Sequence, residues 1–153
     1  MNDSSPDSAR TVSPDASLSD AATELFGRRG VGALAEKMGI VVLERSAERA
    51  VARMPVDGNT QPVGILHGGA HVVLAETLGS IAANVHAGPG RLAMGIELNA
   101  SHSRSAAAGW VTGTCTAIHL GRTLTTHQVV MTDDDGRLLS TVRITNFLTD
   151  DRG

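Results

Sequence analysis

The longest uninterrupted run of apolar and small residues lies in the middle of the chain, from Ala70 to Ala87. It stops at Gly88-Pro89-Gly90, a strong signal for the end of a helix. Alanine and glycine recur along the run, so the predicted helix is thin. A thin apolar helix fits a central position packed closely against a sheet better than a position on the surface.

Shorter apolar segments on both sides of this helix have the pattern of strands. Two strands are predicted within residues 39–56, and four within 91–105, 109–120, 123–132 and 137–148. In the first of these four, Leu92, Met94, Ile96 and Leu98 alternate with polar positions, so we expect them to form a core-facing row. The order of helices and strands predicts an α+β domain whose antiparallel sheet wraps the long helix.

The two ends of the chain have a different composition. Residues 1–17 are rich in Ser, Asp and Pro and are predicted to be a disordered tail. Residues 17–39 have a helical pattern that Gly27, Gly30 and Gly32 interrupt. We expect one folded domain over 18–149 and a short tail at 150–153.

Charge and length exclude several classes of protein. The 153 residues carry a net charge of −3, which argues against nucleic acid or a membrane surface as a partner. The first 20 residues lack the basic-then-apolar order of a secretory signal, and no apolar stretch has the ~20 residues needed to cross a bilayer. The expected location is therefore the cytoplasm.

Metal and disulfide chemistry is not favoured either. The single cysteine, Cys115, excludes a disulfide within the chain and lies in a strand-like segment where it is expected to be buried. His67 and His71 are four residues apart but lack a third ligand at a recognisable spacing. We therefore expect no metal site and no cofactor.

Glu76 is the one Asp, Glu, Lys or Arg between Gly58 and Gly90, and a lone charge in apolar surroundings is a candidate functional group. Ser80 is four residues further along the helix and shares its face. At the start of the helix, the Gly68 amide has no partner within the helix and is suited to bind a carbonyl oxygen as an oxyanion hole. Gln61 and His67 are expected to orient that carbonyl.

The spacing of these groups raises a difficulty. Glu76 lies about seven residues inside the predicted helix, which is roughly 10 Å from the Gly68 amide. One chain can hardly bring both groups to one carbonyl. A symmetric dimer with antiparallel central helices solves this, because the partner then supplies the carboxylate.

Three segments in order carry a resemblance to a known family: GILHGGAHVVLAETLGS, IELNASHSRSA and IHLGRT. They resemble the hotdog-fold acyl-CoA thioesterases of the 4-hydroxybenzoyl-CoA and phenylacetate-pathway type. The likeness is nearest to the bacterial branch that acts on 1,4-dihydroxy-2-naphthoyl-CoA and on aroyl groups of enterobactin-type carrier proteins. It extends from about Gly39 to Leu148.

The resemblance implies a role for each matching residue. Glu76 would be the catalytic carboxylate, Gln61, His67 and the Gly68 amide would polarise the thioester carbonyl, and Ser80 would lie beside the attacking water. The further substrate and coenzyme A contacts would be His102, Arg104, Gly121, Arg122 and Thr123. The family's catalytic groups also come from two subunits, so a homodimer, and further a dimer of dimers, is expected.

We therefore predict a thioesterase that hydrolyses an acyl-CoA, most readily one with an aromatic acyl group. Glu76 would act as nucleophile or as general base, since both roles need the same carboxylate in the same place. Three alternatives stay open: a carrier-protein thioesterase with a proofreading role, a non-catalytic acyl-CoA sensor, and a hotdog dehydratase that uses His67.

Overall fold

The computed structural model describes residues 30–151, which form two helices and six strands. The helices are α2 (Ala33–Lys37) and α3 (Gly68–Ala87). The strands are β1 (Val41–Arg45), β2 (Arg49–Pro55), β3 (Arg91–His102), β4 (Trp110–Leu120), β5 (Leu124–Thr132) and β6 (Leu138–Asp150).

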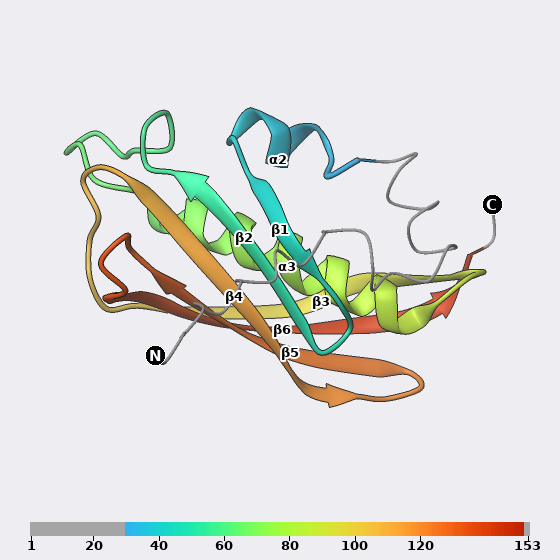
Figure 1. Cartoon of the computed structure of the whole chain (residues 1–153). Coiled ribbons are helices and arrows are strands. Elements are labelled where there is room, and N and C mark those ends of the chain that lie inside the picture. Colours follow the sequence, from blue (N-terminus) through green and yellow to red (C-terminus); the bar gives the residue numbers. More distant parts are fainter. Residues whose placement is uncertain (1–29, 152–153) are drawn as a thin grey trace, which may run out of the picture.

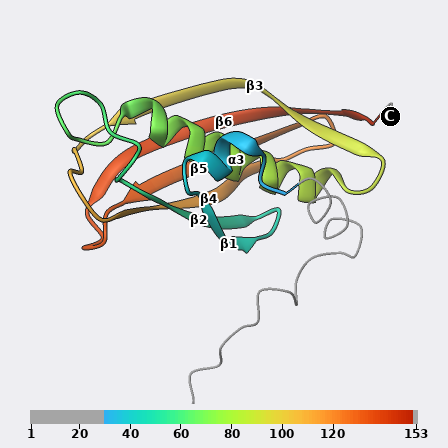
Figure 2. The same ribbon diagram turned by 90° about the horizontal axis from the view of Figure 1, so that it is seen from above.

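All six strands form one antiparallel sheet in the order β1-β2-β4-β5-β6-β3. The sheet curls around α3, and α2 lies over the middle of that helix when the molecule is seen from above (Figures 1 and 2). The predicted α+β fold, an antiparallel sheet wrapped around a long central helix, is confirmed. Because β3 pairs with β6 alone among the described strands, it forms one edge of the sheet.

Helix α3 begins two residues earlier than the apolar pattern predicts, at Gly68 instead of Ala70. The reason is the side chain of His67, whose Nδ1 accepts a hydrogen bond of 2.8 Å from the Gly69 amide and so caps the helix. At the other end, Gly88 has a φ of 74°, a conformation that glycine adopts readily. The predicted stop at this glycine is confirmed.

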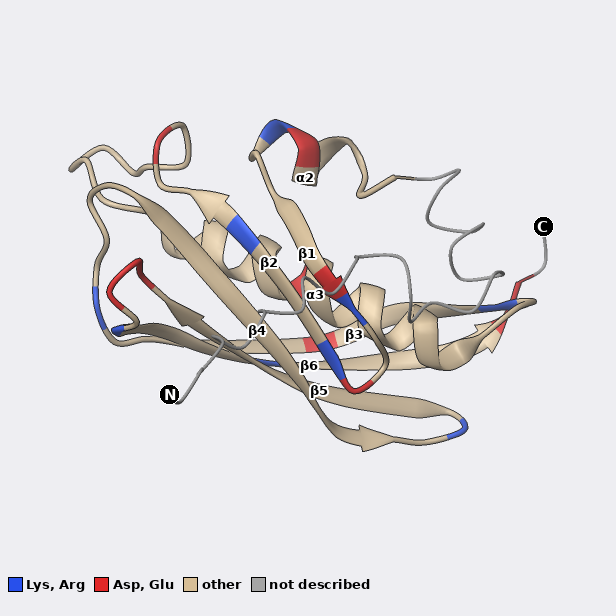
Figure 3. Cartoon of the chain, viewed as in Figure 1, with Lys and Arg blue, Asp and Glu red and all other residues tan. Residues whose placement is uncertain are grey.

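The expectation of a thin central helix is also confirmed. A Cβ added to Gly79 would lie only 2.4 Å from Cγ2 of Ile144 on β6, so the helix rests directly on the sheet there. Leu74 and Leu78 are fully buried on the same helix and belong to the core. Figure 3 shows that charge is nearly absent from α3, where Glu76 is the one Asp, Glu, Lys or Arg.

Strand β3 contains a β-bulge that the alternating pattern does not reveal. Its pairing with β6 shifts between Gly95 and Glu97. Before the shift Gly95 lies opposite Asn146, and after it Leu98 lies opposite Ile144; both of these β6 residues are buried. Odd-numbered residues of β3 therefore face the helix before the bulge, and even-numbered residues face it afterwards.

The bulge corrects the predicted core-facing row. Met94 and Ile96 are 50% and 59% exposed, and Leu92 is on the same outward face as Met94, so the prediction is wrong for these three residues. Leu98 packs against the core, and His102, four residues later, faces the start of α3. His102 therefore shares the inward face of Leu98, because the bulge precedes both residues.

At the two ends the structure covers only part of what was predicted. Residues 1–29, which include the expected tail and most of the predicted first helix, lie outside the described residues. Of that helix, the described part contains the five residues of α2. Strand β6 continues to Asp150, one residue beyond the expected end of the domain at 149.

Candidate active site

The start of α3 offers an unpaired backbone donor. The Ala70 amide bonds the His67 carbonyl at 2.9 Å, and the Gly69 amide bonds the His67 side chain. Within residues 30–151, no acceptor is found for the Gly68 N–H. This donor lies at the positive end of the helix dipole, which suits the developing negative charge of a thioester carbonyl.

The loop before the helix is held by its own backbone. The Gln61 amide bonds the Ile65 carbonyl at 2.8 Å, the Leu66 amide bonds the Ala106 carbonyl at 2.8 Å, and the His67 amide bonds the Asn59 carbonyl at 2.9 Å. These bonds fix where the Gly68 amide points. The side chain of His67 is exposed and its Nδ1 is taken by the helix cap, so the ring has only Nε2 left for a substrate.

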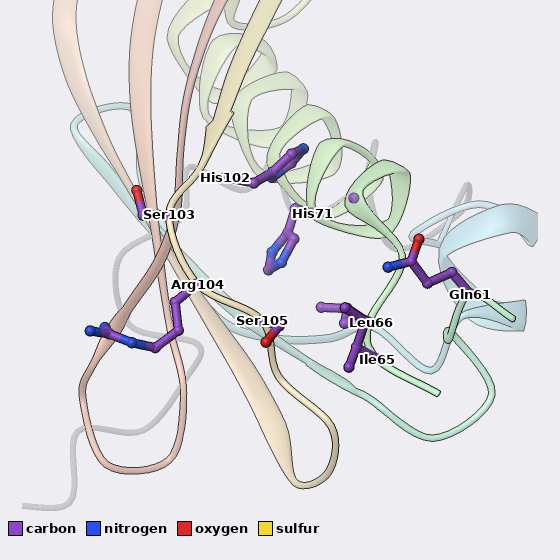
Figure 4. A pocket seen from close by; sticks show the side chains of 9 residues that line it. Gln61, Ile65, Leu66, His71, His102, Ser103, Arg104 and Ser105 are labelled. Atoms are coloured by element: carbon purple, nitrogen blue, oxygen red, sulfur yellow. The ribbon is translucent and has the colours of Figure 1, made fainter. Parts of the chain in front are cut away.

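A cavity of about 410 Å³ opens beside Gly68. Gln61, His102 and Arg104 line it together with the glycine, and Figure 4 shows Gln61 and Arg104 on opposite sides of it. Four of the residues singled out in the sequence are thus brought together. Arg104 donates a hydrogen bond from Nη1 to the Leu138 carbonyl at 3.1 Å, which holds it at the rim.

The cavity also contains His71, which the sequence reasoning did not select as a site residue. It is only 3% exposed, its Nδ1 has no hydrogen-bond partner among the described residues, and its ring lies 5.4 Å from that of His102. Burial, with a smaller effect of His102, lowers its pKa to about 4. His71 is therefore neutral at pH 7. His71 comes three residues after Gly68, so both lie on one face of the helix. This spacing is the signal in the sequence that identifies His71 as a candidate.

His102 is fixed by a serine on the neighbouring strand. Its Nδ1 lies 3.0 Å from Oγ of Ser140, which is fully buried and stands opposite His102 in the pairing of β3 with β6. The Ser140 hydroxyl in turn donates to the Ser101 carbonyl at 3.1 Å. The His102 side chain remains exposed to the cavity.

Glu76 lies in a second hollow, separate from the one beside Gly68. This hollow has a volume of about 390 Å³ and is lined by the segment 31–35 with Val73, Glu76, Thr77 and Ser80. Glu76 is exposed there, and Ser80 shares its helix face as predicted. Glu76 is eight residues from Gly68, about 12 Å along the helix axis. One chain therefore does not bring the two groups together.

The turn between β4 and β5 lies at the far end of α3 from Gly68. His86, in the last turn of α3, donates from Nε2 to the Gly121 carbonyl at 2.9 Å. Arg91 donates to the Arg122 carbonyl at 2.8 Å. The predicted contacts Gly121, Arg122 and Thr123 are thus close to two basic side chains. In a single chain they are remote from the cavity beside Gly68.

Two further expectations concern burial and ligands. Cys115 is fully buried, as predicted, and burial raises the pKa of its thiol to about 12. Among residues 30–151, no three His, Cys, Asp or Glu side chains are placed to hold a metal ion. In the same part of the chain no helix has the length and apolar character needed to cross a membrane.

Residues 30–151 thus place one long helix inside a curled antiparallel sheet, which is the arrangement of the hotdog fold, with an unpaired amide at the helix start and one carboxylate on its side. Comparison with known proteins agrees. The thioesterase superfamily profile matches residues 63–140. The proofreading thioesterase EntH of Cronobacter sakazakii is 41% identical over 126 residues, which cover 82% of this chain and 92% of that protein.

Solved structures give the same result. A Haemophilus influenzae thioesterase has a TM-score of 0.77 at 31% identity, covering 86% of this chain and 92% of that one. A mutant thioesterase of Pseudomonas aeruginosa has a TM-score of 0.74 at 34% identity, covering 85% and 94%. The chain therefore belongs to the thioesterase superfamily, and it hydrolyses thioesters.

Proposed function

We propose that the protein hydrolyses an acyl-CoA, most readily one with an aromatic acyl group, at a site built from two subunits. Gly68 of one subunit would bind the carbonyl oxygen, and Glu76 of the other would attack the carbonyl carbon or activate water. The observation that carries the two-subunit site is that Gly68 and Glu76 line two different hollows and lie about 12 Å apart along the axis of one helix.

The edge strand supports a two-subunit site. Strand β3 has one free edge among the described strands, and its outward residues Met94 and Ile96 are exposed. Long edge strands with exposed apolar side chains tend to pair with another chain. Antiparallel pairing of β3 with a second copy would continue the sheet and would place the two α3 helices side by side in opposite directions.

The contacts between α3 and β3 indicate where the two-fold axis would cross. Gly68 lies against His102, and Glu76 lies against Gly95. Residues 68–76 of the helix therefore run alongside residues 95–102 of the strand, in the opposite direction. If Glu76 is to face the partner's Gly68, the axis passes midway between these two helix positions. The matching point on the strand is near Leu98. The proposed dimer therefore centres its strand pairing there.

Coenzyme A would be held at the partner's turn between β4 and β5. This turn lies near the end of α3 in its own subunit. Because the two α3 helices of the proposed dimer run in opposite directions, the turn of one subunit lies on the same side as the start of α3 in the other. Arg122 is exposed there and Arg91 is next to it, so guanidinium groups are available for a phosphate. The mechanism proposed here needs no metal and no redox cofactor. The dimer of dimers and the cytoplasmic location stay predictions.

A carrier-protein substrate is the second candidate. Two relatives at 41% identity are named proofreading thioesterases, and this favours an activity on acyl groups loaded on a carrier protein. Both candidates use the same carbonyl site and the same carboxylate. They differ in which pantetheine-bearing molecule delivers the thioester.

Thiol release from benzoyl-, hydroxybenzoyl-, phenylacetyl- and fatty acyl-CoAs tests the proposal, with Glu76→Gln beside wild type. We expect the variant to lower kcat at least about a hundredfold, since the same volume remains and only the carboxylate is lost. Glu48→Gln, on the exposed turn between β1 and β2, is the matched control and should retain wild-type rates. Binding of CoA esters without turnover would instead favour a non-catalytic acyl-CoA sensor. Activity on an acyl group loaded on a carrier protein, with none on CoA esters, would favour the carrier-protein thioesterase.

A further inference from the structure

The cavity beside Gly68 contains a short chain of hydrogen bonds that the catalytic proposal does not use. It runs from the Nδ1 of His102 to Oγ of Ser140, at 3.0 Å, and on to the carbonyl oxygen of Ser101, at 3.1 Å. Ser140 is fully buried, so water does not compete for its hydroxyl. The directions of these two bonds follow from the number of protons available.

A serine hydroxyl has one proton, and a carbonyl oxygen is always an acceptor. The Ser140 proton therefore points to Ser101. If it pointed to His102 instead, Oγ and the Ser101 oxygen would face each other at 3.1 Å as two acceptors. Because its only proton is used, Ser140 accepts from His102, and Nδ1 of the imidazole carries the proton. In the neutral ring, Nε2 then has a free lone pair.

This lone pair faces the place where the substrate carbonyl is expected. Nε2 of His102 lies 2.9 Å from the point where a Cβ on Gly68 would stand. The ring of His71 lies beside the His102 ring, with centroids 5.4 Å apart and planes tilted by 32°. His71 is buried and neutral, so it adds no positive charge to this part of the cavity. The cavity thus has a donor, the Gly68 amide, and an acceptor next to it.

We propose that Ser140 is a positioning residue that fixes the tautomer of His102, so that Nε2 accepts a hydrogen bond from the acyl group of the substrate. This inference rests on the proposed function. A carbonyl oxygen bound at Gly68 has no proton to give, so the group that meets Nε2 is a hydroxyl or N–H close to the carbonyl. A site built around such a bond discriminates strongly against the analogue that lacks the donor, because the acceptor is then left unpaired.

The tautomer can be measured without any substrate. Two-bond ¹H–¹⁵N spectra of the imidazole distinguish Nδ1–H from Nε2–H in the intact protein, with His102→Asn used for assignment. At pH 8 we expect the Nδ1–H form in wild type, and a mixture of both forms in Ser140→Ala. Thr141→Val, which removes the adjacent hydroxyl from β6, is the matched control and should keep the wild-type form. An Nε2–H tautomer in wild type overturns the proposal.

The effect on specificity is measured as a ratio of kcat/KM values, for the 2-, 3- and 4-hydroxybenzoyl-CoA esters relative to benzoyl-CoA. We expect at least one hydroxybenzoyl ester to be preferred by wild type, and the preference to fall at least about tenfold in Ser140→Ala. Ser140→Thr keeps a hydroxyl and should therefore retain the wild-type preference for that hydroxybenzoyl ester. An equal ratio in wild type and Ser140→Ala overturns the proposal, even if both hydrolyse thioesters. Failure to hydrolyse any thioester contradicts the proposed function, while the spectra still decide the tautomer.

Discussion

The imidazole of His102 occupies the space directly over Gly68: its Nε2 lies 2.9 Å from the position that a Cβ on the glycine would take. Only glycine at this position leaves the His102 ring undisturbed while the unpaired backbone N–H stays beside the cavity. The close approach explains why the residue that starts the helix has no side chain. It also makes two substitutions at Gly68 informative as a pair.

Gly68→Ala adds a Cβ and keeps the N–H. Gly68→Pro adds the same Cβ and closes a ring onto the nitrogen, which removes the donor and puts a carbon in its place. Proline is well tolerated at the first position of a helix, and His67 before it already has the extended conformation that proline requires, with φ −68° and ψ 133°. The end of the His102 side chain can move away from the added carbon in both variants. Relative to Gly68→Ala, we expect kcat of Gly68→Pro to fall about 10²–10³-fold.

Steady-state thiol release with a fast aroyl-CoA checks this prediction, and circular dichroism establishes that both variants keep the helix. Equal rates for the two variants would show that the amide does not bind the carbonyl oxygen.

Acid should destabilise the protein through His71. Burial, and to a lesser degree the nearby His102, lowers its pKa from 6.5 to about 4 in the folded protein. Between pH 6.5 and 4 the unfolded chain binds a proton at this residue that the folded chain does not, so the free energy of unfolding decreases as the pH falls. The loss amounts to at most about 3 kcal/mol and levels off below about pH 4.

Urea unfolding at a fixed protein concentration, repeated from pH 7.5 to 4, measures this loss. His71→Gln should flatten the curve of unfolding free energy against pH over that range. His127 is also buried with a lowered pKa, so some pH dependence will remain in His71→Gln. Parallel curves for wild type and His71→Gln would contradict the prediction.

The contact between α3 and β6 should be intolerant of added volume. In Gly79→Ala the new Cβ would meet Cγ2 of Ile144 at 2.4 Å in a fully buried place. Overpacking of this kind costs about 1–3 kcal/mol and outweighs the gain of about 1 kcal/mol in helix propensity. Chemical denaturation should therefore show a net loss of stability.

A double-mutant cycle that combines Gly79→Ala with Ile144→Ala tests whether the clash with Ile144 causes the loss of stability. If the clash is responsible, the two substitutions together will cost less than the sum of their separate effects. Additive effects would point to a different origin, such as a change in the unfolded chain.

The sequence is informative about the fold for a simple reason: an apolar run with a glycine stop predicts the central helix. The lone carboxylate draws attention because burying a charge is costly, whereas the structure exposes Glu76 at a hollow. Its catalytic role stays a prediction. The His67 cap was not predicted, since the periodicity of the helix says nothing about which side chain bonds its first amides. The start of α3 was therefore placed two residues late.

Other features depend on contacts between distant segments. The bulge in β3 reverses which residues face inward, and the alternation of Met94 and Ile96 continues through it without a visible break. The sequence considers His71 only as a metal ligand together with His67, because its neighbour on β3 becomes known only from the structure. Gln61 and His67 follow from their place as polar residues in the loop before the helix, whereas Arg104 and the 121–123 turn depend on the family resemblance. The roles of all these residues stay predictions.

The central claim is that each active site combines Gly68 of one subunit with Glu76 of another, and subunit mixing tests it most directly. Gly68→Pro and Glu76→Gln chains, each inactive alone, are co-expressed with different tags, and the mixed dimer is purified through both. Its thiol release is then compared with that of wild type and of each parent dimer.

In a shared site, each mixed dimer has one doubly altered site and one intact site, so it should recover about half of the wild-type activity per dimer. If the Gly68 amide and the Glu76 carboxylate of the same chain formed each site, every site of the mixed dimer would contain one of the two substitutions. The mixed dimer would then be as inactive as its parents, and that result would contradict the account.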